Sequence, residues 1–125
     1  MEIIELINEA ASYISSLWVE HMVLVKLAID VAYGRVDASL LVRVLGSHIS
    51  KESAIVSKGL LNLKTLSEVK DMYGELSRLY IGGGLGKGDL ARFVKLLEKH
   101  DSEFRAELTR IVEDIYAKSM EALST

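Results

Sequence analysis

Apolar residues recur along this chain at alternating spacings of four and three, and that period limits the fold more than any other feature. In the first part of the chain it runs through Ile3, Ile7, Ala10, Ile14, Leu17, Leu24, Ala28 and Val31. The same period returns from Leu90 to Ile115. The pattern predicts one long helix over residues 2–33 and a second over 89–123, which is two helices if Ser102 caps a new one.

Shorter helices are predicted between the two long ones. Asp37 can cap a helix that Gly46 stops, and Ser50 can cap another that runs to about residue 64. Thr65 and Glu68 have the spacing of a capping box, which predicts a helix over 66–80, either separate from its predecessor or fused with it. No stretch alternates with period two for long enough to predict a strand.

The predicted fold class is therefore all-α. We expect a helical bundle with two long outer helices and two or three shorter helices between them. A chain of 125 residues, half of them apolar, is long enough for one hydrophobic core, so a single domain over residues 1–125 is expected.

Composition restricts location and chemistry. The chain has no cysteine, which excludes disulfides, thiolate metal ligands and cysteine nucleophiles. Met1 is followed by acidic residues instead of a basic segment, and the most apolar run, 17–33, contains four ionisable side chains. We therefore expect a cytoplasmic protein that does not enter a membrane. The absence of glutamine favours a heat-adapted source.

Five glycines and one lysine fall within residues 82–88. The Walker phosphate-binding motif would need glycine at Ile81 and a hydroxyl residue at Gly88, so the segment does not match it. A weaker anion site would use Gly84, Gly86, Lys87 and Gly88. The favoured interpretation is an inter-helix loop whose glycines supply backbone freedom.

The middle of the chain is locally basic. Residues 35–70 hold six basic and three acidic side chains, a net +3, although the whole chain carries −3. Residues 38–66 resemble a helix-turn-helix with Gly46 at the turn. Its second helix would present Lys51, Ser53, Ser57 and Lys58 to nucleic acid, and Arg43 and Lys64 are the further contacts expected from this segment.

The three histidines are the remaining candidates for chemistry. Their spacings match neither Glu-x-x-His nor His-Glu-x-x-His, and a helix break is predicted between His48 and Glu52. No metal ligand, catalytic residue or cofactor is therefore predicted. His21 and Asp101 each interrupt the apolar stripe of a long helix, and antiparallel helices with aligned centres would bring them together as a buried polar pair.

Wide apolar stripes and the lack of a reactive cluster favour a non-enzymatic protein-interaction or oligomerisation module, possibly a small subunit of a larger assembly. Its expected partner is a second copy or another protein. The alternative is the nucleic-acid-binding module, and the third is a ligand- or anion-binding bundle.

Overall fold

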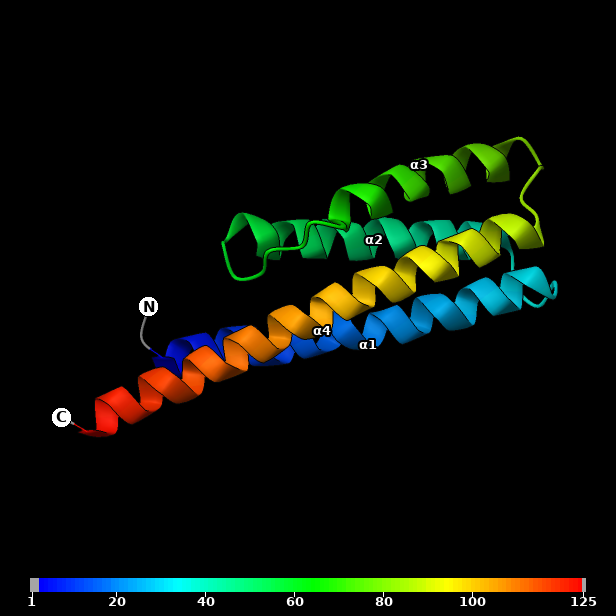
Figure 1. Ribbon diagram of the computed structural model, residues 1–125. Helices are drawn as coiled ribbons and strands as arrows, with labels where there is room; N and C mark the ends of the chain where they lie inside the picture. The colour runs from blue at the N-terminus through cyan, green and yellow to red at the C-terminus, as the bar shows by residue number, and fades with distance from the viewer. Residues whose placement is uncertain (1–2, 125) are drawn as a thin grey trace.

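The computed structural model describes residues 3–124, with side chains from residue 12 onward. The described chain forms four helices: α1 (Ile3–Ala32), α2 (Ala38–Ser57), α3 (Leu66–Ile81) and α4 (Lys87–Ser124). Figure 1 shows them running alternately up and down, and each helix packs against the next, with α4 returning against α1. The predicted all-α bundle, with two long helices and two shorter ones between them in sequence, is confirmed.

The core lies along the inner stripe of each helix. Its fully buried apolar side chains come from all four helices and include Leu17, Leu24, Leu41, Leu45, Leu76, Phe93, Leu97 and Phe104. Asp37 caps α2 as predicted, because its Oδ1 accepts the backbone N–H of Ser39 at 2.8 Å. Apolar burial on one stripe of each helix thus explains why the helices assemble.

The predicted helix break at Gly46 is wrong, because α2 continues without interruption through Gly46 and Ser50. Gly46 is instead a point of close approach between α2 and α3. A Cβ atom built on it would lie 3.0 Å from the hydroxyl of Tyr73 and 3.1 Å from its ring. Glycine costs about 1 kcal/mol in helix propensity relative to alanine, and packing in the bundle overrides that preference.

The predicted capping box at the start of α3 is also absent. Thr65 makes no side-chain cap, and Glu103 of α4 accepts the backbone N–H groups of Lys64 and Thr65 at 2.8 and 2.9 Å. Glu107 accepts the N–H of Asn62 in the same loop. These two carboxylates hold the α2–α3 loop against α4, so α2 and α3 are separate helices.

The second long helix is a single one, because α4 continues through Ser102. It begins at Lys87, so Lys87 and Gly88 form its first turn and the glycine loop is shorter than predicted. Gly83 has the only positive φ of this loop, +72°. Asp89 Oδ2 accepts the N–H of Gly86 at 2.9 Å and so caps the helix from inside its first turn.

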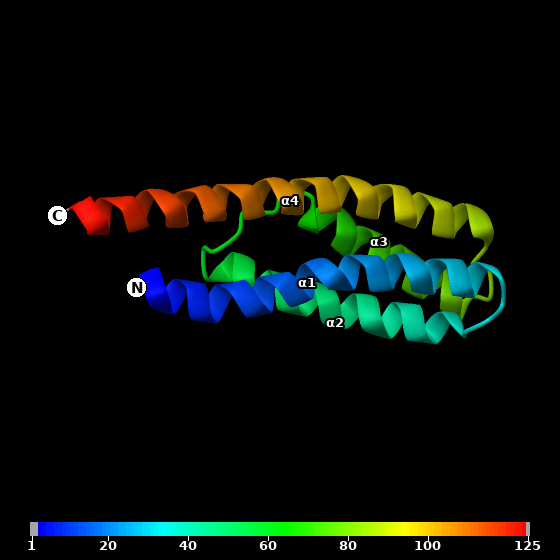
Figure 2. The same cartoon turned by 90° about the horizontal axis from the view of Figure 1, so that it is seen from below.

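The two long helices extend beyond the other two. Figures 1 and 2 both show the last turns of α4 and the first turns of α1 lying past the end of α2, with the two termini at that same end. At 1.5 Å per residue, the 38 residues of α4 measure about 57 Å and the 16 of α3 about 24 Å. Within residues 3–124, no helix is long and apolar enough to cross a membrane.

Candidate metal centre

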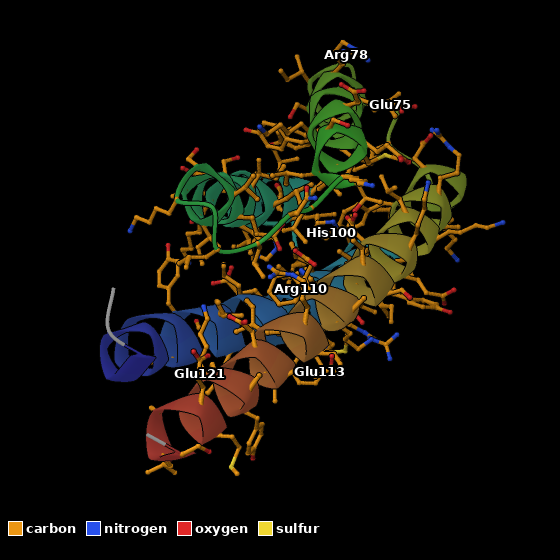
Figure 3. All side chains as sticks on the ribbon, turned by 60° about the vertical axis from the view of Figure 1, so that its left-hand side comes forward. Glu75, Arg78, His100, Arg110, Glu113 and Glu121 are labelled. Carbon is orange, nitrogen blue, oxygen red and sulfur yellow. The ribbon has the colours of Figure 1, made fainter. Side chains whose placement is uncertain are left out.

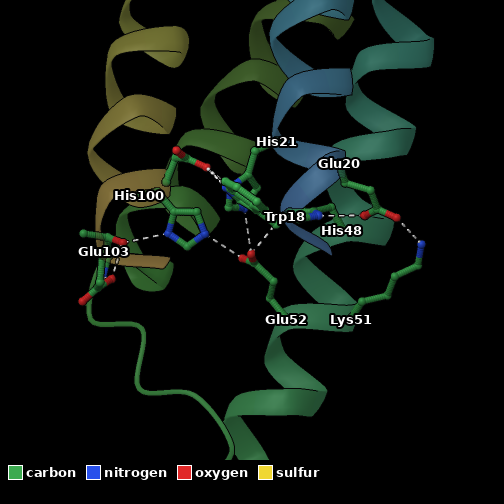
Figure 4. Close-up of polar contacts among 10 residues, drawn as sticks. Trp18, Glu20, His21, His48, Lys51, Glu52, His100 and Glu103 are labelled. Carbon is green, nitrogen blue, oxygen red and sulfur yellow. Dashed lines mark hydrogen bonds and ion pairs between the residues drawn. The ribbon is translucent and has the colours of Figure 1, made fainter. Parts of the chain in front are cut away.

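The three histidines meet at one point in the core, together with Glu52. His21 comes from α1, His48 and Glu52 from α2, and His100 from α4, and all four side chains have no exposed surface. One potential ligand atom from each lies within 4.8 Å of the others. Figure 4 shows the imidazoles gathered around the carboxylate of Glu52.

The Nε2 atoms of all three rings point at that carboxylate. Nε2 of His100 lies 2.7 Å from Oε1, and Nε2 of His21 lies 3.0 Å from Oε2. Nε2 of His48 is 2.9 Å from Oε2 but at an angle that makes no hydrogen bond. Among the described side chains, this nitrogen is the one buried polar atom without a hydrogen-bond partner.

The outer nitrogen of each ring has its own acceptor. His21 Nδ1 lies 2.8 Å from Oδ1 of Asp101, and His48 Nδ1 lies 2.7 Å from Oε1 of Glu20. His100 Nδ1 lies 2.7 Å from the hydroxyl of Thr65. Outer partners of this kind fix the ring orientation of metal-ligating histidines.

These partners also fix which nitrogen carries the proton. The Thr65 hydroxyl donates to Glu103 Oε1 at 2.6 Å, so it accepts from Nδ1 of His100. Glu20 accepts from the ammonium of Lys51 at 2.7 Å. Burial raises the pKa of Glu20, but the hydrogen bonds from Lys51 and His48 outweigh it and lower that pKa, so Glu20 is a carboxylate acceptor.

Asp101 orients His21 in the same way. Its Oδ1 accepts the indole N–H of Trp18 at 3.1 Å, and its Oδ2 lies 3.1 Å from Nε of Arg105. An indole N–H and a guanidinium can only donate, so Asp101 is surrounded by donors. In all three histidines Nδ1 therefore carries a proton, and the Nε2 atoms face Glu52.

Glu52 is ionised within this cluster. Burial raises its pKa, but the hydrogen bonds with His100 and His21 and the close approach of His48 outweigh it, and its pKa falls well below the usual range. A carboxylate oxygen facing three nitrogen lone pairs is repulsive unless positive charge lies between them. That charge can come from protons on the nitrogens or from one metal ion.

Protonation of every ring is an expensive way to supply this charge. The ring centres of His21 and His48 are 4.9 Å apart, and those of His21 and His100 are 5.1 Å apart. Two unit charges at about 5 Å repel by roughly 3 kcal/mol at an effective dielectric constant of about 20. A single divalent ion supplies two positive charges at one point without placing three imidazolium ions side by side.

The donor set fits zinc(II) or a similar divalent transition metal. Three imidazole nitrogens and one carboxylate oxygen are ligands that zinc takes in tetrahedral geometry. In such a tetrahedron the ligand atoms are about 3.3 Å apart, which follows from bonds of about 2.0–2.1 Å. The distances from the nitrogens to Glu52 are 2.7–3.0 Å, a few tenths of an ångström shorter than this separation. The four ligand atoms are spread over as much as 4.8 Å, so binding an ion also requires the imidazoles to move closer together.

The structure brings His21 and Asp101 together, as the alignment of the long helices predicts. It also shows that the pair is one part of a larger cluster. The expectation of no metal ligands rests on a helix break between His48 and Glu52. The continuous α2 removes that break and places the two residues one turn apart on one face.

The residues predicted to contact nucleic acid do not form a helix-turn-helix. Arg43, Lys51, Ser53 and Ser57 all belong to the single helix α2, and Lys58 and Lys64 lie in the loop that follows. Lys51 is paired with Glu20 at 2.7 Å. The helix-turn-helix prediction is therefore wrong, because Gly46 serves the contact with Tyr73 and makes no turn.

The predicted anion loop is divided between two elements. Gly84 and Gly86 lie in the linker, whereas Lys87 and Gly88 lie in α4. The ammonium of Lys87 is 4.9 Å from the centre of the Tyr33 ring, a cation–π contact with the end of α1. The backbone N–H of Gly86 already donates to the carboxylate of Asp89, so it is not free to bind an anion. The linker therefore serves to connect α3 and α4.

Sequence spacing did not identify Glu20, Glu52, Thr65 and Glu103 as partners of the histidines. The one local signal is the i, i+4 relation of His48 and Glu52, since the other contacts join residues at least 28 positions apart. No family model, curated protein or solved structure matches this chain, so its function is argued from this geometry.

Proposed function

We propose that this protein binds one divalent transition metal ion, with zinc(II) as the best match, through His21, His48, Glu52 and His100. The observation that carries the proposal is the convergence of three buried Nε2 atoms on one carboxylate, while every Nδ1 is held by an acceptor. The buried and unpartnered Nε2 of His48 supports the same conclusion independently, because an ion gives it a bond.

The ion has a structural role in this proposal. Four protein donors without exposed surface complete a tetrahedral shell, whereas catalytic zinc keeps a position open for water or substrate. The ligands join α1, α2 and α4, and Thr65 links His100 to the start of α3. One ion therefore ties all four helices at the level of the cluster.

Metal binding is tested by titrating the purified, chelator-treated protein with zinc(II) in a calorimeter and measuring bound metal after dialysis. We expect one ion per chain. Cobalt(II) in place of zinc should give the intense visible absorption of a tetrahedral site, which distinguishes the buried cluster from surface carboxylates.

Two variants with matched shapes sharpen this test. Glu52→Gln keeps the side chain's size but removes its charge and should weaken zinc binding by at least about tenfold. Glu68→Gln makes the same change on the surface of α3, where Glu68 pairs with Lys99, and should bind zinc like the wild type. Zinc binding that is absent in the wild type, or equal in wild type and Glu52→Gln, would refute the proposal.

Self-association, the function expected from the apolar stripes of the sequence, is a second proposal. Its support is a row of exposed apolar side chains on α1 and α4, among them Val19, Met22, Tyr116 and Met120, which are 58–70 % exposed. The arrangement of these side chains specifies one kind of partner.

A further inference from the structure

The outer face of the α1–α4 pair carries many of the exposed large apolar side chains among the described residues. Two cavities open on it between the helices. The larger, about 580 Å³, is lined by small residues including Ala32, Ala91 and Val94, with Lys87 and Lys95 at its edge. The smaller, about 230 Å³, is lined by Trp18, Val19, Met22, Asp101 and Arg105.

The protruding apolar residues of this face lie at its other end. Val112, Tyr116, Met120 and Leu123 continue the face that contains Arg105, because their spacings follow the helical period. They are 49, 70, 61 and 82 % exposed and belong to the last turns of α4. One end of the face is thus hollow and the other end projects.

The same face is also divided in charge. Lys87, Lys95 and Glu98 line the cavity at the hollow end and together carry a net positive charge, whereas Glu113 lies toward the projecting end. Figure 3 shows Glu113 on α4. Among the described residues, Lys95 and Glu113 form no ion pair, so their charges are available to a partner.

We infer that a second copy of this chain covers the face in an antiparallel, two-fold dimer. A two-fold axis placed at the middle of both long helices overlaps them over their full length. The middle of α1 falls at Trp18 and the middle of α4 at Arg105, and these two residues line the same cavity. A single two-fold axis can therefore pass through the middles of both α1 and α4.

That axis brings opposite features together. Tyr116 lies 11 residues after Arg105 and Val94 lies 11 before it, so Tyr116 of each copy faces the large cavity of its partner. Met120 meets the level of Ala91 in the same way. Glu113 comes within about one helical turn of Lys95 of the other copy. Shape and charge both favour the antiparallel arrangement.

The size of the face is sufficient for a stable dimer. Two helices side by side are about 20 Å wide, and the 30 residues of α1 measure about 45 Å. Their overlap covers about 900 Å² on each copy, close to the roughly 800 Å² per partner of a standard protein interface.

The oligomeric state is tested first by sedimentation equilibrium at micromolar concentration and low salt, where we expect a dimer. Lys95→Glu and Glu113→Lys should each weaken dimerisation by about tenfold, because each places like charges together. A chain carrying both Lys95→Glu and Glu113→Lys again places opposite charges together across the interface, so it should recover most of the affinity. Lys70→Glu, the same reversal on exposed α3, is the control and should dimerise like the wild type.

The register is tested by disulfide trapping, which suits a chain without cysteine. Arg105→Cys lies at the proposed axis and should cross-link to itself. Tyr116→Cys should not cross-link to itself but should cross-link to Val94→Cys when the two proteins are mixed.

A monomer at all concentrations would overturn the inference, and so would a dimer that none of the charge reversals affects. Self-cross-linking of Tyr116→Cys would show a parallel dimer and would also overturn it. These measurements do not depend on metal, so their failure leaves the zinc proposal untouched.

Discussion

Nε2 of His48 lies 2.9 Å from Oε2 of Glu52, one turn further along α2, yet the two atoms form no hydrogen bond. Two side chains four residues apart on an exposed helix can usually rotate until they form a hydrogen bond. His48 and Glu52 cannot rotate in this way, because Nδ1 of His48 is held by Glu20 and the oxygens of Glu52 are held by His21 and His100. A buried nitrogen without a partner costs about 1–3 kcal/mol, which a metal bond removes.

Zinc should therefore raise the melting temperature of the protein. An ion at 100 times its dissociation constant stabilises the folded state by about 2.7 kcal/mol, which is about 10 °C for a domain of this length. Differential scanning calorimetry with and without zinc measures the shift. Excess chelator should reverse it, and a melting temperature that zinc leaves unchanged would contradict the prediction.

Replacing Asp101 by asparagine should weaken zinc binding without unfolding the bundle. Asparagine keeps an oxygen that can accept from Trp18 and His21, but it lacks the charge that increases the basicity of His21. Loss of such an outer partner typically costs about 10–100-fold in metal affinity. Trp18 is the only tryptophan, so its fluorescence follows the titration in both proteins. Equal affinities would show that Asp101 only positions the indole.

Glu103→Gln should destabilise the protein at neutral pH by about 1 kcal/mol, the usual value of a lost helix cap. Burial raises the pKa of Glu103, and the hydrogen bonds from Thr65 and Lys64 outweigh it, so the folded-state pKa lies below the ordinary value. The contribution of the charge is therefore complete above the unfolded pKa of about 4.3 and is lost as the pH falls through the folded pKa.

Urea unfolding of metal-free wild type and Glu103→Gln at about pH 7 and about pH 3 measures this effect. The difference in free energy of unfolding between the two proteins should shrink at the lower pH, because the Glu103 carboxyl of the unfolded chain is then largely protonated and the stabilisation is lost as the pH falls toward the folded pKa. Comparing differences cancels the other effects of pH, which both proteins share. A difference independent of pH would contradict the charge argument.

Gly46→Leu should destabilise the protein by about 1–3 kcal/mol, although leucine favours helix far more than glycine does. The new side chain would overlap Tyr73, which already lies 3.0 Å from the position of a Cβ. The double variant Gly46→Leu, Tyr73→Ala should recover much of the loss, since it frees that space. Chemical unfolding of all four proteins gives the interaction energy, and additive effects would exclude a steric origin.

Periodicity predicts the all-α class and the two long helices, because an apolar stripe of period 3.6 forms one face of a helix that can be buried. The error at Gly46 shows the limit of local reasoning. A glycine that stops a helix and a glycine that admits a neighbouring tyrosine look the same until the partner helix is placed.

The site was predictable in one part only. His21 and Asp101 each interrupt an apolar stripe, and that interruption is visible in the sequence. Glu52 cannot be recognised as a partner of His48 as long as a helix break is predicted between them. The Thr65 hydroxyl is equally compatible with a capping box, so the sequence does not indicate its contact with His100. Their roles depend on α4 lying against the α2–α3 loop, a long-range contact that no local pattern encodes.

Glu103 holds the amides of Lys64 and Thr65, and the Thr65 hydroxyl holds His100. An ion that immobilises His100 therefore also restrains a loop that it does not touch. Exchange of these two amide hydrogens with deuterium should slow when metal binds and accelerate when a chelator removes it. The exchange rates of the Lys64 and Thr65 amides should therefore report how much of the protein has bound metal. They can be measured on the unmodified chain, without any label in the core.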